Sequence, residues 1–446
     1  MKIVIAGAGE VGLHLAKMLG DEFHDITVID ADMRKLEDAM SNGDVFTIKG
    51  DMTTFETLEK AELKTCNLFI AVSQYESRNI LSAMLAKRMG AKKVIARIDN
   101  DEYLQPDNKD VFLNMGIDYL FYPEKGAANE VITLLSNTSS SEYFGFSDNR
   151  LTLVVMTLDS YSPLVDRSLL QLTKNTEKLH YRTVAISRNG ETIIPHKEDI
   201  FKEGDTIYVI ANRRYADDVL SLSGKDKIQV KNLMILGGSK IGQRIALAMQ
   251  DTLKVKLIDY NLEKANLLSE RLKNTLVIYA DGRNKDLMVE EQLGEMDAFV
   301  AVTGRSETNI LTAMLAKKLG VKKVIAEIEN INYINLAASM GIDTVINKKL
   351  TTASNIFRFT MNTDVQAIKC LNGCDAEVLE LIAKPGSIIT KHNLRDLKFP
   401  TNATIGGIVR GDKVIIADGN TEIKAYDRVV VFSMPDAILK IGRYFD

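Results

Sequence analysis

Short apolar runs separated by longer amphipathic stretches recur through the first hundred residues of the chain. The runs, rich in Val, Ile, Leu and Phe, are Lys2–Ala6, Ile26–Ile29, Val45–Ile48, Leu68–Val72 and Val94–Arg97. Continuous apolar runs of this length are typical of strands buried on both faces of a parallel sheet. The stretches between them are long enough for crossover helices, so the pattern predicts a doubly wound, Rossmann-like α/β unit.

The chain repeats itself at an offset of 230 residues. Of the twenty residues in Asn79–Ile98, fifteen are identical in Asn309–Ile328. Further pairs at this offset, or within one residue of it, are Gly7 and Gly237, Gly12 and Gly242, Asp30 and Asp259, and Asp51 and Asp281. Agreement this dense indicates duplication of a whole structural unit, so a second parallel sheet is expected.

Each α/β unit is followed by a smaller segment whose runs alternate with turns. Arg188–Ile194 matches Arg410–Ile416, and Asp205 matches Asp427, both at an offset of 222. The Asn189-Gly190 dipeptide predicts a hairpin, so these segments are expected to be small β-rich α+β modules. Such a module suits packing against another copy, or binding a small effector.

Polar breaks divide the chain at Ser136–Glu142 and Ser223–Val230, with a vaguer break at Cys370–Asp375. We therefore expect Rossmann-like domains at residues 1–138 and 230–361, followed by β-rich modules at residues 139–223 and 362–446.

The first apolar run leads directly into Gly7-Ala8-Gly9-Glu10-Val11-Gly12, and an amphipathic helix follows. A glycine pattern between a strand and a helix predicts a dinucleotide site. Gly7 permits the tight turn, Gly9 lets the backbone approach a pyrophosphate, and Gly12 lets the helix pack on the strand. The helix N-terminus then offers free N–H groups to the phosphates.

Polar residues follow the carboxyl ends of the other strands, the edge where ligands bind in such sheets. Asp30 lies 23 residues after Gly7, where a carboxylate binds a ribose diol and disfavours the 2′-phosphate of NADP. Asp51 and Ser73 lie at the same edge, and Ser73–Glu76 resembles a capping box. Arg97 either neutralises a phosphate or is a surface arginine.

The second glycine loop is altered, since it reads Gly237-Gly238-Ser239-Lys240-Ile241-Gly242 and places Ser239 where Gly9 stood. Asp259 retains the ribose acid. Charged positions change between the copies: Glu10 becomes Lys240, Arg97 becomes Glu327, Thr53 becomes Arg283 and Tyr75 becomes Arg305. We expect two unequal sites that differ in preference among NAD, NADH and ATP.

Composition excludes several classes of function. A net charge of −4 over 446 residues provides no positive electrostatic potential that would attract nucleic acid. No run is long enough to cross a bilayer, and the chain enters a strand at once, so neither a membrane span nor a signal peptide is expected. Cys370 and Cys374 suggest a redox pair or half a metal site, but no second Cys/His pair accompanies them, which favours reduced thiols and no metal.

Residues for catalysis are not evident. Of the five histidines, His14 is expected in the first helix and His24 in a loop, and the three in the β-rich segments lack a repeated acid partner. No nucleophile motif or phosphate-transfer loop is present. A binding protein is therefore favoured over an enzyme. An NAD-dependent oxidoreductase with an unrecognised substrate domain is the main alternative, and an NAD-sensing transcription regulator is disfavoured because a basic recognition helix is lacking.

Over essentially its whole length the chain resembles the regulatory subunits of bacterial Trk potassium uptake systems, which are tandem pairs of RCK (regulator of potassium conductance) modules. The resemblance rests on Lys2–Gly12, Val28–Asp30, Gly50-Asp51, Ala71–Ser73 and Asn79-Ile80. It implies a cytoplasmic subunit, peripheral on the inner face of the cell membrane, that gates potassium uptake. It also implies a homo-oligomeric ring beneath a membrane-embedded potassium-translocating subunit of the TrkH/TrkG type.

The resemblance further implies NAD or NADH as ligand, with ATP or ADP as alternatives where the two sites differ. Carried over by position, the first site is Gly7 to Val11, Asp30, Ser73, Gln74 and Arg97. The second site is Gly237 to Ile241, Asp259, Thr303 and Glu327. No catalytic residue is implied.

Overall fold

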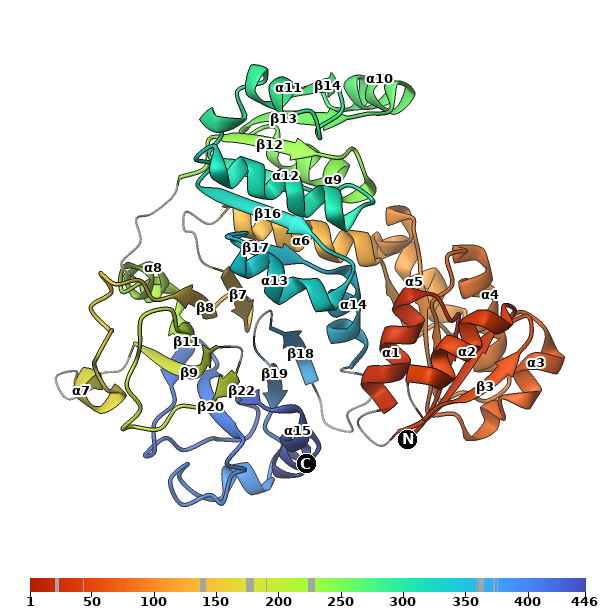
Figure 1. The fold of residues 1–446 in the computed structure, drawn as a ribbon. Coiled ribbons are helices and arrows are strands. Elements are labelled where there is room, and N and C mark those ends of the chain that lie inside the picture. Colours follow the sequence, from red (N-terminus) through yellow and green to blue (C-terminus); the bar gives the residue numbers. More distant parts are fainter. Residues whose placement is uncertain are drawn as a thin grey trace. The chain divides into compact units, whose positions relative to one another are not determined.

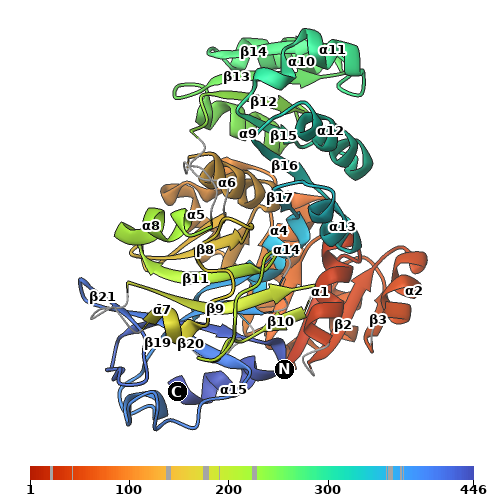
Figure 2. The same cartoon turned by 60° about the vertical axis from the view of Figure 1, so that its left-hand side comes forward.

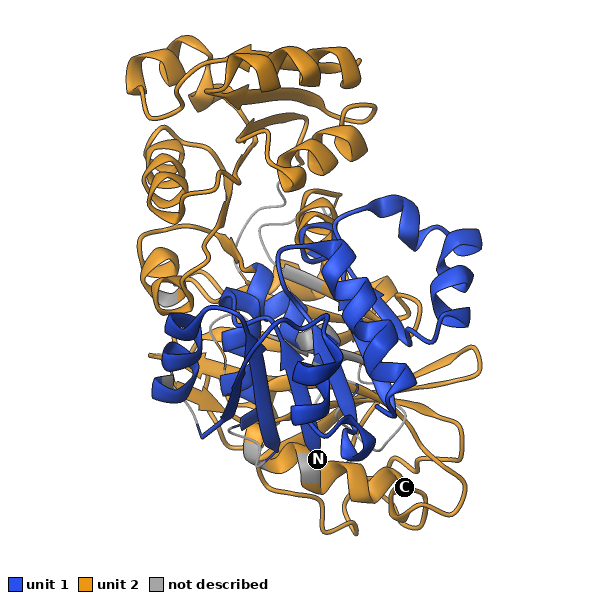
Figure 3. Ribbon diagram, turned by 90° about the vertical axis from the view of Figure 1, so that its right-hand side faces the viewer, with its two compact units in different colours: residues 1–126, 348–360 blue, residues 127–347, 361–446 orange. Residues whose placement is uncertain are grey.

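The structure is a computed structural model with two compact units (Figure 3). Unit 1 comprises residues 1–126 and 348–360, and unit 2 comprises residues 127–347 and 361–446. The structure describes residues 1–20, 24–42, 44–136, 142–173, 180–189, 191–223, 229–357, 359, 365–371, 374 and 376–446. Most of the predicted breaks at residues 136–142, 223–230 and 370–375 therefore lie outside the described residues.

Unit 1 contains a parallel sheet whose described strands lie in the order β3-β2-β1-β4-β5-β6. Its edge strand β3 is labelled in Figure 1. The strands are β1 (Lys2–Ala6), β2 (Asp25–Asp30), β3 (Phe46–Lys49), β4 (Leu68–Ala71), β5 (Lys93–Arg97) and β6 (Tyr119–Phe121). The strand order reverses between β1 and β4, which creates the crevice where doubly wound sheets bind ligands. The predicted Rossmann-like fold is confirmed.

Helices cover this sheet, and their apolar residues pack on strand residues such as Val4 and Phe69, both fully buried. The α-helices of this first copy are α1 (Glu10–Gly20), α2 (Met33–Asn42), α3 (Phe55–Lys60), α4 (Glu76–Arg88), α5 (Pro106–Asn114) and α6 (Pro123–Ser136).

The predicted duplicate is confirmed in unit 2, where a second parallel sheet has the order β14-β13-β12-β15-β16-β17 in the described chain. Its strands are β12 (Asn232–Leu236), β13 (Lys254–Asp259), β14 (Thr275–Tyr279), β15 (Ala298–Ala301), β16 (Lys323–Glu327) and β17 (Thr344–Ile346). The helices that accompany it are α9 (Lys240–Met249), α10 (Leu262–Arg271), α11 (Lys285–Glu290), α12 (Ser306–Lys318), α13 (Ile334–Ser339) and α14 (Lys348–Phe357).

The last helix of each α/β copy belongs to the compact unit of the other copy. From Ala127 onward α6 is part of unit 2, where Val131 and Leu134 are buried in one apolar cluster with Leu233 and Val300. In the same way α14 is part of unit 1, where it packs against α1. Burial of an apolar helix face drives this packing, but amphipathicity alone does not specify which sheet receives the face.

Two antiparallel sheets form the predicted β-rich modules. The first has the order β10-β9-β11-β8-β7, and its elements are β7 (Glu142–Phe146), β8 (Leu151–Thr157), α7 (Leu169–Thr173), β9 (Tyr181–Arg188), β10 (Glu191–Ile193), β11 (Thr206–Asn212) and α8 (Ala216–Ser221). The second has the order β18-β19-β22-β20-β21, and its elements are β18 (Val365–Cys370), β19 (Glu377–Ile382), η6 (Ile388–Thr390), β20 (Ala403–Arg410), β21 (Lys413–Ile416), β22 (Arg428–Ser433) and α15 (Pro435–Phe445). The predicted hairpin is confirmed, since Glu191 pairs with Arg188, although Gly190 lies outside the described residues.

The two β-rich modules pack on one another through a shared core, as the sequence had suggested for such modules. Figure 2 shows β9 and β11 of the first module beside β20 of the second. The rings of Tyr208 and Phe432 lie 6.4 Å apart, and the Arg182 guanidinium donates to the Ala417 carbonyl at 2.7 Å. A Cβ on Gly406 would lie 2.7 Å from Ile210, so this glycine permits the close approach of the modules.

The matched Arg and Asp of the two modules form a repeated buried ion pair. Arg188 contacts Asp205, and Arg410 contacts Asp427, each at 2.7 Å. Both carboxylates are 1% exposed and also accept hydrogen bonds from nearby backbone N–H groups. A structural role therefore explains why these residues recur at an offset of 222.

His14 of α1 makes unit 1 sensitive to acid. Burial, followed by the positive charges of Lys349 and Lys17, lowers the pKa of His14 to about 4. In the unfolded chain His14 is protonated below about pH 6.5, whereas in the folded chain it is protonated only below about pH 4. The free energy of unfolding therefore falls as the pH drops from about 6.5 to about 4. We expect the free energy of unfolding to fall by about 2 kcal/mol more between pH 7 and 4 in the wild type than in His14→Leu. Urea unfolding at both pH values measures this difference, and identical pH dependence would contradict it.

Candidate nucleotide-binding sites

The first glycine loop connects β1 to α1 at the reversal of strand order. Gly7 has φ +115°, and a Cβ there would lie 2.8 Å from the Ser73 amide nitrogen. A Cβ on Gly12 would lie 1.9 Å from the Gly7 carbonyl oxygen, whereas a Cβ on Gly9 would meet no atom within 4 Å. Gly7 and Gly12 are therefore required by the turn and by packing, as predicted, and the space beside Gly9 is open.

Asp30, at the end of β2, holds the loop in place. Its Oδ2 accepts a hydrogen bond from the Ala8 N–H at 2.8 Å, and its Oδ1 accepts one from the Asp32 N–H at 2.9 Å. A carboxylate has about four acceptor positions, so Asp30 can still accept hydrogen bonds from a ribose diol. Glu10 opens α1 and forms an ion pair with Lys349 at 3.2 Å.

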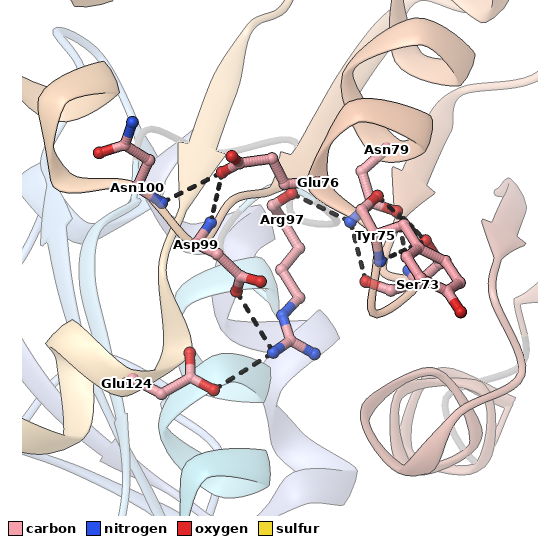
Figure 4. A network of polar contacts seen from close by, with 8 residues as sticks. All are labelled: Ser73, Tyr75, Glu76, Asn79, Arg97, Asp99, Asn100 and Glu124. Atoms are coloured by element: carbon pink, nitrogen blue, oxygen red, sulfur yellow. Dashed lines mark hydrogen bonds and ion pairs between the residues drawn. The ribbon is translucent and has the colours of Figure 1, made fainter. Parts of the chain in front are cut away.

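A buried asparagine organises the end of β4 (Figure 4). Asn79 is fully buried, and its Oδ1 accepts from the Ser73 N–H at 2.8 Å and from the Ser73 hydroxyl at 2.7 Å. Its Nδ2 donates to the carbonyls of Ser73 and Arg97. Asn79 therefore joins the ends of β4 and β5. Asn79 was not among the predicted site residues. The signal in the sequence was an asparagine on the buried face of a helix, repeated as Asn309 in the second copy.

The predicted capping box at Ser73–Glu76 is wrong. Helix α4 begins at Glu76 with no side-chain cap, because the Ser73 hydroxyl donates to Asn79. The Glu76 carboxylate accepts from the N–H groups of Asp99 and Asn100 at 2.7 and 3.1 Å (Figure 4). Hydrogen bonds to residues outside the motif therefore replace the predicted capping bonds of Ser73 and Glu76.

Arg97 is not a surface residue, and two carboxylates lie beside its guanidinium. Its side chain is 19% exposed, and its guanidinium lies 3.2 Å from Glu124 and 3.6 Å from Asp99 (Figure 4). The alternative of a surface arginine is therefore wrong. Two carboxylates compensate its charge, which leaves less positive potential for a ligand than the sequence suggested. Gln74 lies exposed in the loop after β4.

Asp51 is held as a carboxylate at the end of β3. Hydrogen bonds from the Thr53 N–H, from Arg78 and from the Thr53 hydroxyl lower the pKa of Asp51 to about 2. The Arg78 guanidinium lies 2.5 Å from the carboxylate. In the second copy the cation comes from another position: Arg283 bonds to Asp281 at 2.7 Å and lowers its pKa to about 2.

Exchanging Arg78 for the threonine that occupies the equivalent position 308 tests this arrangement. In Arg78→Thr we expect the pKa of Asp51 to rise from about 2 toward its ordinary 3.8, because one of its hydrogen-bond donors and a positive charge are lost. The pKa of Asp281 should stay at about 2 as an internal control. Carboxyl titration by NMR measures both, and an unchanged Asp51 would contradict the assignment.

The second site repeats this framework. Gly237 has φ +107°, and a Cβ on Gly242 would lie 2.0 Å from the Gly237 carbonyl oxygen. Asp259 accepts from the Gly238 N–H at 2.7 Å and is 4% exposed. Thr303 and Asn309 reproduce the Ser73–Asn79 contacts, and Asn309 donates to the Glu327 carbonyl at 2.8 Å.

The second site differs from the first at the loop and in its charges. The Ser239 hydroxyl caps α9 by accepting from the Gly242 N–H at 3.2 Å, so a side chain lies where the first loop has none. Lys264 contacts Asp259 at 3.2 Å. Glu327, which stands where the first copy has Arg97, is 3% exposed. Helix α9 begins at Lys240, and the next residue, Ile241, is buried.

A cavity of about 330 Å³ lies at this second site. The loop residues Gly237 and Ser239, both strand-end acids, and the cations Lys264, Arg283 and Arg305 line it. The volume is within the range of small-ligand pockets. Acceptors for a ribose and donors for phosphates thus converge on one concave surface.

Metal ligands, cysteines and membrane-spanning helices are the other candidate features of the described part of the chain. No group of three or more His, Cys, Asp or Glu side chains that could hold a metal ion occurs there. Neither Cys66 nor Cys374 forms a disulfide bond with another described residue, and the side chain of Cys370 lies outside the described residues. None of the described helices combines the length and the apolar character that a membrane span requires.

Family models match both halves of the chain. The TrkA-N domain matches residues 3–123 and 233–348, and the TrkA-C domain matches residues 153–224 and 378–446.

Curated relatives match over the full length. A Trk system potassium uptake protein TrkA from Vibrio alginolyticus is 30% identical over 97% of this chain and 95% of its own length. A TrkA homolog from Archaeoglobus fulgidus and TrkA homolog 1 from Methanosarcina mazei are each 31% identical over 100% of both chains.

Solved structures share the fold. The GsuK RCK domain has a TM-score of 0.61 at 13% identity, covering 100% of this chain and 94% of that one. The GsuK channel bound to NAD has a TM-score of 0.62 at 13% identity, covering 100% and 78%. The predicted tandem RCK architecture is therefore confirmed.

Proposed function

This chain belongs to the TrkA family, and on that premise we propose that it is a cytoplasmic, adenine-nucleotide-binding regulatory subunit that gates a Trk-type potassium uptake system. One observation carries the proposal: in both copies a glycine loop at the reversal of strand order is held by the strand-end acid, Asp30 or Asp259. A binding site without catalytic residues suits a subunit that acts through a conformational equilibrium.

We assign the first site to Gly7–Gly12, Asp30, Asp51, Ser73, Gln74 and Arg97, and the second to Gly237–Gly242, Asp259, Asp281, Thr303 and Glu327. The module bounds that we propose are residues 1–138, 139–223, 230–361 and 362–446. Asp30 and Asp259 are the acids that would bind the ribose of a dinucleotide. For the first site we therefore propose NAD or NADH as the ligand. Solved structures of the GsuK channel include one bound to NAD and one bound to ADP.

The second site is proposed to prefer a more highly charged nucleotide such as ATP. Arg305 lines the cavity of the second site, and the uncharged Tyr75 stands at the equivalent position of the first. Arg283 adds no charge relative to the first site, because it pairs with Asp281 as Arg78 pairs with Asp51. The cavity lining therefore gains a cation at position 305, which favours a triphosphate, while Glu327 stands in the second site where the first site has Arg97.

Binding measurements on full chains with one site disabled test this inequality. In Gly12→Ala, where the second site remains, we expect the ratio of ATP affinity to NAD affinity to exceed that in Gly242→Ala by about tenfold. Arg305→Tyr in the Gly12→Ala background should remove most of that difference. Equal ratios in the two single-site chains, measured by calorimetry, would refute unequal sites.

The proposed partner is a membrane-embedded potassium-translocating subunit of the TrkH/TrkG type, to which the chain binds as a homo-oligomeric ring at the inner face of the membrane. A ligand shifts a gate only by its differential affinity for the two states, so a ring would sum the shifts of its subunits.

Reconstitution tests this function. Vesicles containing a Trk-type membrane subunit are assayed for potassium flux with and without the chain, and then with NAD, NADH, ATP and ADP. We expect flux to depend on the chain and on at least one nucleotide. A potassium flux that is unchanged by every nucleotide would overturn the gating proposal. Steady NADH consumption with a carbonyl substrate would favour an oxidoreductase instead.

A further inference from the structure

The second β-rich module contains a cavity of about 710 Å³ that is separate from both glycine loops. One wall is η6 and the loop after it, and the other is α15, which ends at the C-terminus (Figure 1). The volume lies within the range of about 300–1,000 Å³ that is usual for small-ligand pockets.

Direct contacts hold the two walls together. The Tyr444 hydroxyl of α15 donates to the Lys398 carbonyl, and the rings of Phe399 and Tyr444 pack edge to face with centroids 5.3 Å apart. At the start of α15, the Met434 N–H donates to the Asn402 carbonyl at 2.9 Å. The cavity is therefore formed in advance, which reduces the entropy lost when a ligand binds.

The lining of the cavity is positively charged. Lys398 comes from the loop wall, and Lys440 and Arg443 come from α15, whereas Asp396 supplies the one carboxylate among the lining residues that the structure describes. Within the described residues none of these three cations forms an ion pair. Cations that converge in a concave site focus the field and attract anions.

The floor of the cavity is apolar. Leu397 is 9% exposed and Ala437 is 2% exposed, while Ile388, at 42% exposed, adds an apolar side chain to the lining. A ligand that carries both an anionic group and an apolar group would match this lining better than an inorganic ion.

The duplicate module lacks the two cations of α15 although it has the same fold. At the offset of 222, Asp218 stands for Lys440 and Ser221 for Arg443. The corresponding helix α8 has 6 residues, whereas α15 has 11. The fold of the module therefore does not require the cations at positions 440 and 443.

We propose that this cavity binds a small organic phosphate. The phosphate lies among Lys398, Lys440 and Arg443, and the apolar part of the ligand packs on Leu397 and Ala437. This site gives the chain an input that is independent of nucleotide binding at the glycine loops.

Equilibrium dialysis of the full chain with phenyl phosphate, which combines the two required groups, tests the proposal. The wild type should bind it saturably and should not bind phenol. Lys440→Asp with Arg443→Ser, the residues of the first module, should weaken binding by about tenfold or more through loss of two charge-assisted contacts. Lys413→Asp changes an exposed lysine of β21 outside the cavity and should bind as the wild type does.

The outcomes that overturn the proposal are distinct. One is no saturable binding of phenyl phosphate to the wild type, and another is equal binding by the double variant. A third arm uses phosphatidylglycerol vesicles: if the double variant loses vesicle binding and no chain binds phenyl phosphate, the cations contact a membrane surface instead. Because both substituted side chains are exposed, circular dichroism should show an unchanged fold, and Lys398→Gln provides a milder second variant.

Discussion

Gly12→Ala is expected to remove nucleotide binding at the first site, lowering NAD affinity by about a hundredfold or more. The new Cβ would lie 1.9 Å from the Gly7 carbonyl oxygen, which is backbone and cannot rotate away. Relief requires α1 to shift from β1, and its N–H groups then no longer converge on the phosphates. Calorimetry of NAD binding to the full chain in a Gly242→Ala background isolates the first site.

Gly9→Ala is the matched control for this prediction. A Cβ at Gly9 would meet no atom within 4 Å, so the fold should be unchanged and any loss of affinity would come from the methyl group facing the ligand. Undiminished NAD binding by Gly12→Ala would show that the loop is not the phosphate site.

Asn79→Ala is expected to destabilise the first Rossmann-like unit by about 2–4 kcal/mol. The substitution leaves the Ser73 N–H without its acceptor, and the Arg97 carbonyl loses the Asn79 Nδ2 donor, at a fully buried position. Buried groups without partners are costlier than the hydrogen bonds they lose. Urea unfolding followed by hydrogen exchange in α4 and β5 reports on this unit.

Asn108→Ala provides the comparison for Asn79. The Asn108 side chain makes one exposed hydrogen bond, to the Glu102 carbonyl, so its removal should cost less than about 1 kcal/mol. Asn309→Ala should reproduce the Asn79 effect in the second unit, because its contacts are the same. Similar small effects of all three substitutions would argue against an organising role.

The local parts of both sites could be predicted from sequence because their physics is local. Gly7 and Gly12 are dictated by a turn and a helix packed on a strand, and the offset of 230 transfers the same requirement to Gly237 and Gly242. The position of the acid at the end of the second strand follows from the alternation of strands and helices along the chain.

The remaining parts depend on which distant groups meet. Ser73 and Glu76 have the spacing of a capping box, but Asn79 and the loop after β5 bind them instead. Arg97 suggested a phosphate partner until the start of α6 placed Glu124 beside it. The exchange of α6 and α14 between the compact units also could not be predicted, because both helices present an apolar face and nothing local selects the sheet.

The difference between the two copies is informative because the framework is constant. The glycine loop, the strand-end acid and the buried asparagine are repeated, while Ser239, Arg305 and the basic lining beside α15 are not. Residues that the fold requires are thus duplicated, whereas the residues to which we assign ligand preference differ between the copies.

The central claim is that a nucleotide in the first glycine loop controls potassium flux. The direct test compares the change in flux caused by NAD in vesicles that contain a Trk-type membrane subunit with either the wild-type chain or Gly12→Ala. The account predicts that NAD changes flux with the wild type and has no effect with Gly12→Ala, although both chains bind the vesicles equally. An equal response to NAD with both chains would contradict it.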